Sequence, residues 1–281
     1  MKISRMHCLL LWITLKYTYQ GGFTMSDRIL VTLLDQAARG KGYGYSADLS
    51  EAFRHLRTNI EFSNFEKKIK VISIVSAKPT EGKSTVAANL AVVMAGQHPR
   101  VLLIDCDLRK PVVHKMFHAS NKSGLSNLLL ESSFEPGVFN KYCQQIMHPN
   151  ITNELFLITS GPVVPNPSEM LSSKKFKDLI ASLRNSFDII ILDGPPVLPV
   201  PDSIPIGLTA DGTLFVIASE QTEKEAAQIA VTTLRRSNVN LLGTVLTMIK
   251  KESSSYQYSY TAYRETHPKK SMFKKKKEKL D

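Results

Sequence analysis

The stretch at residues 71–91, VISIVSAKPTEGKSTVAANLA, constrains the fold of this chain more than any other feature. It reads as a β-branched strand, a turn punctuated by proline and glycine, and a helix of small apolar residues. A phosphate-binding loop needs this order, because its backbone N–H groups and the helix dipole together hold anionic phosphates. The sequence therefore predicts a nucleoside triphosphate site, whose contacts come from the loop and the first helical turn: Lys78, Pro79, Thr80, Glu81, Gly82, Lys83, Ser84 and Thr85.

Three positions of this loop have separate expectations. Lys83 should reach the β- and γ-phosphate oxygens of ATP, and the Ser84 hydroxyl should ligate Mg²⁺. Ala77 stands where the motif has its first glycine. An alanine is tolerated there if its φ stays negative, because only positive φ penalises a side chain strongly.

Further apolar runs predict a buried, mostly parallel sheet. Runs of this kind alternate with helical segments, the clearest at residues 168–185 and 223–238. Such alternation implies an α/β fold with a doubly wound sheet, in which ligands gather beyond the carboxyl ends of the strands. We expect strands at residues 71–75, 100–105, 154–160, 187–193, 212–219 and 241–249.

Two of these predicted strands end in aspartates. Asp105 and Asp107 follow the run RVLLI, and Asp193 closes the run IIIL before a Gly-Pro-Pro turn. An acid at a strand end is often only a turn residue. Beside a phosphate-binding loop, however, Asp193 has the Walker B form, in which the carboxylate holds the hydrated magnesium ion.

The charge distribution indicates which partners the chain can bind, and the cysteine content indicates its cellular compartment. The chain has 281 residues and a net charge of +11, enough length for one sizeable core with terminal extensions. Residues 264–281 hold eight Lys or Arg against three acids, a basic end suited to anionic lipid, nucleic acid or simple solvation. The three cysteines lack metal or disulfide spacing, which favours a reduced cytosolic compartment. We expect His114 and His118 to be surface or packing residues rather than metal ligands.

Composition also predicts the domain boundaries. Residues 1–24 are expected to be a non-native or disordered extension, with translation starting at Met25. Residues 25–47 are glycine-containing and read as a flexible lead-in. Residues 48–250 form the predicted P-loop domain, and residues 251–281 a flexible tail with a tyrosine cluster and the basic end.

The P-loop domain should open with a helix at residues 48–64. Phe53, Leu56 and Ile60 would share its apolar face. Charged residues spaced by three form a second group, which is either a solvated face or a contact surface: Glu51, Arg54 and Arg57. In the tail, alternation of tyrosine with polar residues allows either an edge strand or an exposed flexible segment, and its position beside the lysine-rich end favours exposure.

Together these motifs resemble the bacterial tyrosine kinases of the capsule and exopolysaccharide biosynthesis type. The matching segments are SAKPTEGKST as Walker A, LLIDCDLRKP as Walker A′ and IIILDGPP as Walker B, and the match covers about residues 50–263. The resemblance implies a P-loop NTPase of the deviant Walker, partition ATPase-like type. It also implies that Glu51, Arg54 and Arg57 join subunits into a ring-like homo-oligomer. The implied phosphate acceptors are Tyr256, Tyr258, Tyr260 and Tyr263.

The implied reaction transfers the ATP γ-phosphate to tyrosines of this chain, in trans within an oligomer, and to other proteins. The resemblance assigns catalysis to Lys83, Asp105, Asp107 and Asp193, and Mg²⁺ binding to Ser84, Asp105 and Asp193. A tyrosine phenol has a pKa of about 10, so a carboxylate near the γ-phosphate should accept its proton as it attacks. Asp105 and Asp107 both fit this task.

The resemblance also implies partners. A transmembrane adaptor should supply a cytoplasmic tail that completes the site and hold the chain at the inner face of the cell membrane. A cognate tyrosine phosphatase should reverse the reaction, and no nucleic acid is expected. The implied role is control of capsule or exopolysaccharide assembly.

The alternative is a partition or division-site ATPase that acts as an ATP-switched dimer on DNA or membrane. Lys78 stands where that class has its signature lysine, but Pro79 and Thr80 replace the paired glycines. The tyrosine cluster and the arginine-bearing helix have no role in such a protein. ATP-gated, salt-sensitive DNA binding would favour this alternative.

Overall fold

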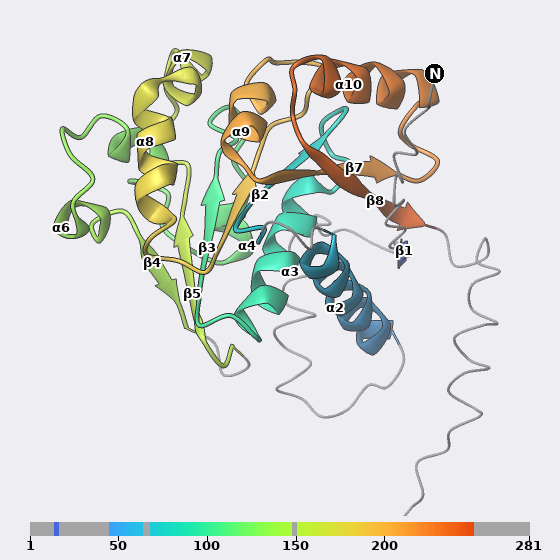
Figure 1. The fold of residues 1–281 in the computed structure, drawn as a ribbon, viewed down its shortest axis with the longest axis horizontal. Coiled ribbons are helices and arrows are strands. Elements are labelled where there is room, and N and C mark those ends of the chain that lie inside the picture. Colours follow the sequence, from blue (N-terminus) through green and yellow to red (C-terminus); the bar gives the residue numbers. More distant parts are fainter. Residues whose placement is uncertain (1–13, 17–44, 64–67, 148–150, 250–281) are drawn as a thin grey trace, which may run out of the picture.

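The computed structural model describes residues 14–16, 45–63, 68–147 and 151–249 (Figure 1). Within these residues the strands form an eight-stranded sheet with the order β1-β8-β7-β2-β6-β3-β5-β4. Every pair is parallel except β4 with β5, which confirms the predicted doubly wound fold class. The strands are β1 (Thr14–Lys16), β2 (Val71–Ser76), β3 (Arg100–Asp105), β4 (Gln144–Ile146), β5 (Glu154–Ile158), β6 (Ile189–Asp193), β7 (Gly212–Ala218) and β8 (Leu241–Ile249).

Helices cover both faces of this sheet, as a parallel sheet requires to bury its strands (Figure 1). Helices α2, α3 and α4 pack on one face, and α8, α9 and α10 on the other. The helices are α2 (Tyr45–Phe62), α3 (Lys83–Ala95), α4 (Val113–Met116), α5 (Leu125–Leu128), α6 (Pro136–Phe139), α7 (Pro167–Ser172), α8 (Lys174–Leu183), α9 (Ser203–Thr209) and α10 (Lys224–Arg236).

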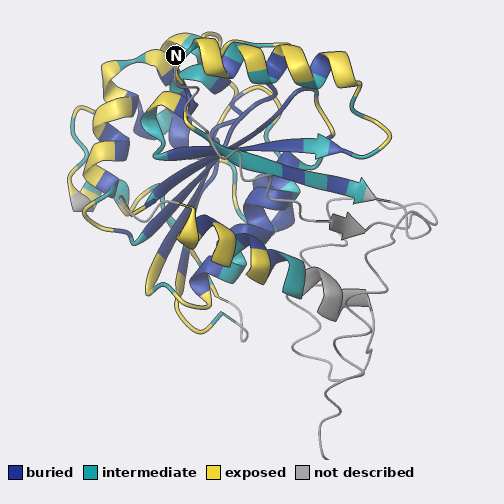
Figure 2. Cartoon of the chain, turned by 45° about the vertical axis from the view of Figure 1, so that its right-hand side comes forward, coloured by how far each residue is buried: buried dark blue, intermediate teal, exposed yellow. Residues whose placement is uncertain are grey.

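The central strand β2 shows how the sequence produces two cores. All six of its residues are buried. Because successive side chains point to opposite faces, Ile72 and Ile74 join the core under α2 and α3, while Val75 joins the core under α10. Figure 2 shows the buried strands between half-exposed helices. This central position fixes the loop that follows β2.

Helix α2 docks on α3 through the predicted apolar face. Phe53, Leu56 and Ile60 are at most 2% exposed and belong to the same core as α3. The helix begins at Tyr45 and therefore extends beyond the predicted start at residue 48.

The helix predicted at residues 168–185 is wrong as a single element. It is two helices, α7 and α8, separated at Ser173, whose backbone is extended with φ −67° and ψ 155°. The Ser173 hydroxyl accepts a hydrogen bond from the Phe176 amide and so caps α8. A serine with this capping role starts a helix rather than continuing one.

Two strands were not predicted from sequence. β4 is a short antiparallel partner of β5 at one edge, and β1 pairs with β8 at the other. β1 lies inside the segment expected to be an extension, residues 1–24. The expected lead-in before Tyr45 and the tail at residues 251–281 lie outside the described residues.

Candidate nucleotide site

The P-loop follows β2 and ends where α3 begins, at Lys83. Gly82 has φ 90° and Thr80 has φ 66°, so both adopt the left-handed conformation. Gly82 does this freely because it has no Cβ, whereas Thr80 occupies a conformation that a side chain disfavours. Ala77 is buried and is not among the described residues with positive φ, as the substitution for glycine requires. The backbone therefore has the tight turn of a phosphate-binding loop.

The Lys83 ammonium lies at the centre of the site. It is buried, donates a hydrogen bond to Asp107 Oδ2 at 3.0 Å and to Ser84 Oγ at 3.2 Å, and lies 3.8 Å from Asp193 Oδ1. These contacts join the P-loop to the ends of β3 and β6, whose registers place Asp105 opposite Asp193. The structure thus brings together all four residues predicted to be catalytic.

Three carboxylates share this one ammonium, and their pKa values differ accordingly. Burial alone would lower the pKa of Lys83, but attraction by Asp193, Asp107 and Asp105 outweighs burial and raises it. Burial would raise the pKa of Asp107, yet Lys83 and nearby backbone amides hold it below its ordinary value. Burial and repulsion by Asp193 raise the pKa of Asp105 well above its ordinary value. The site therefore has more acidic groups than its one ammonium can neutralise.

Asp105 and Asp107 have different surroundings. Both oxygens of Asp105 accept backbone N–H groups, from Asp107 at 3.2 Å and from Val113 at 3.2 Å, which braces the loop between β3 and α4. Asp107 uses Oδ1 to accept the Lys110 amide and Oδ2 to accept Lys83. Asp107 is thus the one of the pair that contacts the P-loop lysine directly.

Asp193 is the residue best suited to a metal ion. It is 0% exposed, and within the described chain neither carboxylate oxygen has a hydrogen-bond partner. Burial raises its pKa to about 6, against the attraction of Lys83. Carboxylate and hydroxyl oxygens are the donors that Mg²⁺ prefers, and Ser84 supplies a hydroxyl at the same place. The residues present therefore fit a magnesium ion with its nucleotide.

The P-loop is contacted by residues that the sequence analysis did not single out, among them Thr222, Glu223 and Thr247. The buried Glu81 carboxylate accepts the Lys78 amide at 3.0 Å and the Thr222 hydroxyl at 2.7 Å. The Thr247 hydroxyl donates to the Glu81 carbonyl at 2.7 Å. Lys78 pairs with Glu223 at 3.0 Å, so its ammonium has a partner within its own chain.

A second network ties the Walker A′ loop to the loop after Asp193. Arg109 donates through Nε to Asp202 at 2.8 Å and through Nη2 to Ser168 at 2.9 Å. Ser168 in turn donates to Asp202, which is only 1% exposed. This network fixes the segments on either side of the site, and the sequence analysis did not predict it.

The residues predicted to form an oligomer contact do not share one surface. Arg54 is 54% exposed and forms an ion pair with Glu51 at 2.8 Å. Arg57 is 12% exposed and donates to the Val93 carbonyl of α3 at 3.2 Å. Glu51 and Arg54 are therefore available to another molecule, whereas Arg57 mainly attaches α2 to α3.

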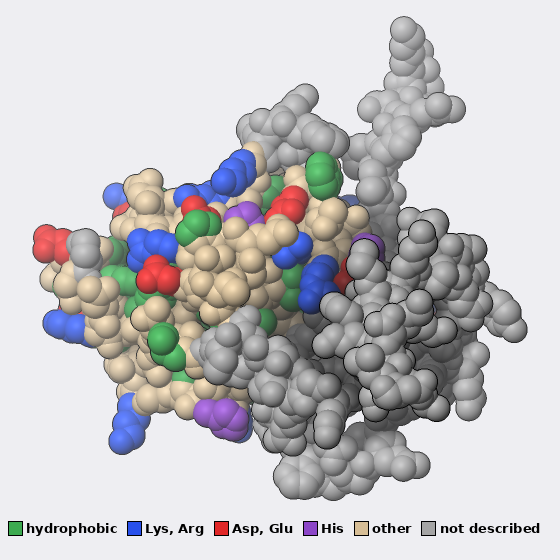
Figure 3. Space-filling view, turned by 90° about the horizontal axis from the view of Figure 1, so that it is seen from below, with side chains coloured by type: hydrophobic (Ala, Val, Ile, Leu, Met, Phe, Trp, Pro, Cys, Tyr) green, Lys and Arg blue, Asp and Glu red, His purple; other side chains and the backbone are tan. Residues whose placement is uncertain are grey.

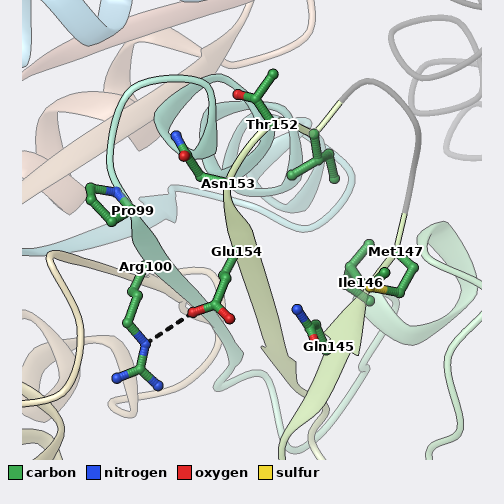
Figure 4. Close-up of a pocket in the computed structure, with 9 residues that line it drawn as sticks. Pro99, Arg100, Gln145, Ile146, Met147, Thr152, Asn153 and Glu154 are labelled. Atoms are coloured by element: carbon green, nitrogen blue, oxygen red, sulfur yellow. Dashed lines mark ion pairs between the residues drawn. The ribbon is translucent and has the colours of Figure 1, made fainter.

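One pocket, near β3 and β5, lies away from this chemistry. A pocket of about 570 Å³ is lined by Arg100 and Glu154, which begin these two strands and form an ion pair at 3.3 Å (Figure 4). It is therefore at the amino ends of the strands, opposite the P-loop. Figure 3, seen from below, shows charged side chains of both signs scattered between single hydrophobic ones. Among the described residues, neither the pocket nor the face in Figure 3 has a cluster of positive side chains that would bind a phosphate.

The remaining predictions concern the tail tyrosines, the two histidines and membrane-spanning helices. Tyr256, Tyr258, Tyr260 and Tyr263 lie outside the described residues. His114 is half-buried and His118 is exposed. In the parts that are described, no group of three or more His, Cys, Asp or Glu could hold a metal. A search of the same parts found no helix with the length and hydropathy to cross a membrane.

Known proteins share this fold. A family model described as an AAA domain matches residues 69–255. The septum site-determining protein MinD of Pyrococcus horikoshii, solved with Mg-ADP, has a TM-score of 0.51 at 22% identity, over 63% of this chain and 69% of that one. At this identity the likeness concerns the fold alone, and together with the family match it confirms the predicted fold class.

Two further relatives are tyrosine kinases. The kinase domain of the Escherichia coli tyrosine kinase ETK has a TM-score of 0.71 at 27% identity, over 88% of this chain and 92% of that chain. The tyrosine-protein kinase YwqD of Bacillus subtilis is 44% identical over 211 residues, which is 75% of this chain and 85% of that protein. These likenesses support the kinase prediction over the partition ATPase alternative, and the chain belongs to the family of bacterial tyrosine-protein kinases.

Proposed function

We propose that this chain transfers the γ-phosphate of ATP to its own tail tyrosines and to tyrosines of other proteins, in the control of capsule or exopolysaccharide assembly. The observation that carries this proposal is the buried cluster at the carboxyl ends of β3 and β6, where one lysine meets three carboxylates beside a P-loop. The four acceptors proposed are Tyr256, Tyr258, Tyr260 and Tyr263.

Each side chain of the cluster has a proposed task. The P-loop from Lys78 to Thr85 binds the phosphates. The negative charge of the bound phosphates attracts the Lys83 ammonium, which turns from Asp107 towards the β- and γ-oxygens. Ser84 and Asp193 would hold Mg²⁺, with Asp105 as the braced carboxylate behind them. When bound, the ion neutralises charge on the β- and γ-phosphates.

Asp107 is the proposed proton acceptor. Its pKa is held below the ordinary value by Lys83 and backbone amides, so it is ionised at neutral pH and ready to accept a proton. Once Lys83 turns to the phosphates, Asp107 loses that ammonium and becomes a stronger base. Asp105 lacks this freedom because backbone amides occupy both of its oxygens.

Phosphorylation in trans needs a second copy within reach. We propose a ring-like homo-oligomer whose contact includes Glu51 and Arg54, which are exposed on α2. Arg57 contributes by fixing α2 on α3. A tethered tail then meets the neighbouring site at high effective concentration.

We further propose a transmembrane adaptor whose cytoplasmic tail completes the site and brings the chain to the inner face of the cell membrane. A cognate tyrosine phosphatase would reverse the modification. The resemblance to the family supports this part of the proposal, and the basic residues at 264–281 would add attraction to an anionic membrane surface.

The deciding experiment is phosphopeptide mass spectrometry of the purified chain after incubation with MgATP, with and without the adaptor's tail. Lys83→Met is the matched inactive variant, because methionine keeps the length of the side chain without its charge. We expect phosphate on residues 256–263 in the wild type and a loss of at least about 100-fold in the variant. Hydrolysis of ATP without phosphotyrosine, even with the tail present, would contradict the proposal.

The oligomer is tested separately by sedimentation velocity and thermal unfolding. Arg54→Ala should weaken association at least about tenfold and leave the melting temperature unchanged, because exposed ion pairs contribute little to stability. Arg57→Ala should lower stability by about 1 kcal/mol through loss of its hydrogen bond to α3. Lys174→Ala, an exposed residue on α8, is the control. Unchanged association in Arg54→Ala would remove this face from the ring.

A further inference from the structure

Glu81 is a P-loop residue whose carboxylate is buried in the protein. It is 1% exposed, and its two oxygens have different partners. Oε2 accepts the Lys78 amide, which closes the turn of the loop on itself, and Oε1 accepts the Thr222 hydroxyl. A buried carboxylate must be satisfied in this way, since an unpaired one is strongly unfavourable.

Thr222 lies in the connection between β7 and α10 and is itself fixed. Its hydroxyl oxygen accepts the Ala218 amide at 2.9 Å, which leaves its proton directed to Glu81 at 2.7 Å. Its neighbour Gln221 donates to Thr80 Oγ1 at 3.3 Å. The end of β7 therefore holds two consecutive residues of the P-loop.

The end of β8 holds the same loop from the other side. Thr247 donates to the Glu81 carbonyl at 2.7 Å, and its side chain lies about 3.5 Å from where a Cβ on Gly82 would be. Glu81 thus receives one hydroxyl on its side chain and another on its carbonyl. On either side of it are Thr80 and Gly82, the two left-handed residues of the loop.

From this geometry we infer that Thr222, acting through Glu81, is a positioning residue that holds the P-loop in its nucleotide-binding shape before the nucleotide arrives. The phosphates are bound by backbone N–H groups, so the orientation of Thr80, Glu81 and Gly82 decides how many of these groups converge. The left-handed conformation of Thr80 makes that shape unfavourable. The hydroxyls of Thr222 and Thr247 compensate by fixing the adjacent residue, Glu81. Preorganisation of this kind lowers the ordering cost of binding. The inference rests on the proposed use of MgATP.

The test compares Thr222→Val with Thr222→Ser in the full-length chain. Valine keeps the β-branched shape and removes the hydroxyl, so Glu81 Oε1 loses its donor. Serine keeps the hydroxyl. We expect Thr222→Val to raise the KM for MgATP about tenfold with kcat changed less than about threefold, and Thr222→Ser to stay within about twofold of wild type. Thr247→Val, which removes the other donor, should raise the KM in the same way.

Thr233→Val is the control, because this hydroxyl donates only to the Ile229 carbonyl within α10. It should match the wild type in KM. Melting temperatures without nucleotide separate the inference from a general loss of fold, since a purely structural role would lower the melting temperature and the active fraction without changing KM. An unchanged KM in Thr222→Val, or a serine variant as weak as the valine variant, would overturn the inference.

Failure of this inference and failure of the proposed function give different results. A thermal shift of the wild type by MgADP, measured first, reports nucleotide binding without any phosphate transfer. If the wild type binds MgADP but forms no phosphotyrosine, the kinase proposal fails while the affinity of Thr222→Val for MgADP still tests the positioning role. If the wild type does not bind MgADP, both fail.

Discussion

The two ends of the parallel strands contain the same kinds of charged side chain in opposite states. At the amino ends, Asp211 accepts hydrogen bonds from the amides of Lys70 and Val71 and from Arg184, at 2.7 to 2.9 Å. At the carboxyl ends, neither oxygen of the buried Asp193 has a hydrogen-bond partner in the described chain. Asp211 is thus the satisfied carboxylate, with three donors on Oδ2, and Asp193 the available one, with the Lys83 ammonium 3.8 Å from Oδ1.

The pKa values record this difference. For Asp211, burial opposes ionisation, but Arg184 and the amides of Val71 and Lys70 outweigh it and lower the pKa. For Asp193, burial dominates and raises the pKa to about 6. A lowered pKa means that ionisation stabilises the fold, and a raised one means that ionisation destabilises it. Asp211 at the amino ends therefore stabilises the fold, while Asp193 at the carboxyl ends retains an unfavourable charge beside the P-loop.

The largest expected effect comes from removing the available carboxylate. Asp193→Asn should lower the rate of tyrosine phosphorylation by about 10²- to 10³-fold, because the carboxylate that we propose to hold Mg²⁺ is lost. Initial rates with saturating MgATP and an exogenous tyrosine peptide measure this. A variant with more than about a tenth of wild-type activity would show that Asp193 is not essential to the site.

The same substitution should have the opposite effect on folding. Without nucleotide at pH 7.5, Asp193→Asn should unfold with about 1 to 3 kcal/mol more free energy than the wild type, since it removes a carboxylate whose ionisation burial makes unfavourable despite the nearby Lys83 ammonium. Wild-type Asp193 gains a proton as the pH falls through about 6, so the gain should shrink there and vanish near the unfolded pKa of about 3.8. Urea unfolding at pH 7.5, 6 and 5 measures this, and a destabilised variant at pH 7.5 would contradict the assignment.

The satisfied carboxylate should give the reverse pattern, with a smaller effect. Asp211→Asn should lower the unfolding free energy by about 1 to 2 kcal/mol, because a charged hydrogen bond to Arg184 is lost at a partly exposed site. The phosphorylation rate at 25 °C should stay within about twofold of wild type, since this end of the sheet does not contact the nucleotide loop.

A double-mutant cycle with Arg184→Met is the control for that substitution. If the two residues act through their ion pair at 2.9 Å, the double variant should have an unfolding free energy no lower than that of the less stable single variant. Strictly additive losses would show that each residue stabilises the fold separately.

Much of this arrangement was readable from the sequence, because it depends on contiguous patterns. β3 and β8 have the bounds predicted for them, and the acids Asp105 and Asp193 end strands as expected. A continuous apolar run that ends in an acid is a local signal of a buried parallel strand. The P-loop, its lysine and the two strand-end acids meet at one edge because parallel strands share a direction.

What the sequence missed depends on distance along the chain or on helix geometry. Glu81 and Thr222 are 141 positions apart, and no local pattern links them. Arg57 was grouped with Glu51, but six residues at about 100° per residue place it about 120° round the helix. There it lies beside the apolar stripe and reaches the Val93 carbonyl instead of joining the Glu51 surface.

The smallest expected effect concerns acid. Because the folded pKa of Asp211 is lowered, its contribution to stability is fully present above the unfolded pKa of about 3.8 and is lost as the pH falls through the folded value. The difference in unfolding free energy between wild type and Asp211→Asn should therefore be constant from pH 7 to about 5 and decline by about 1 kcal/mol below pH 4. Urea unfolding at half-unit pH steps measures it. A difference that instead changed between pH 7 and 5 would show that the folded pKa of Asp211 is not lowered, and would remove the contrast between the two ends of the sheet.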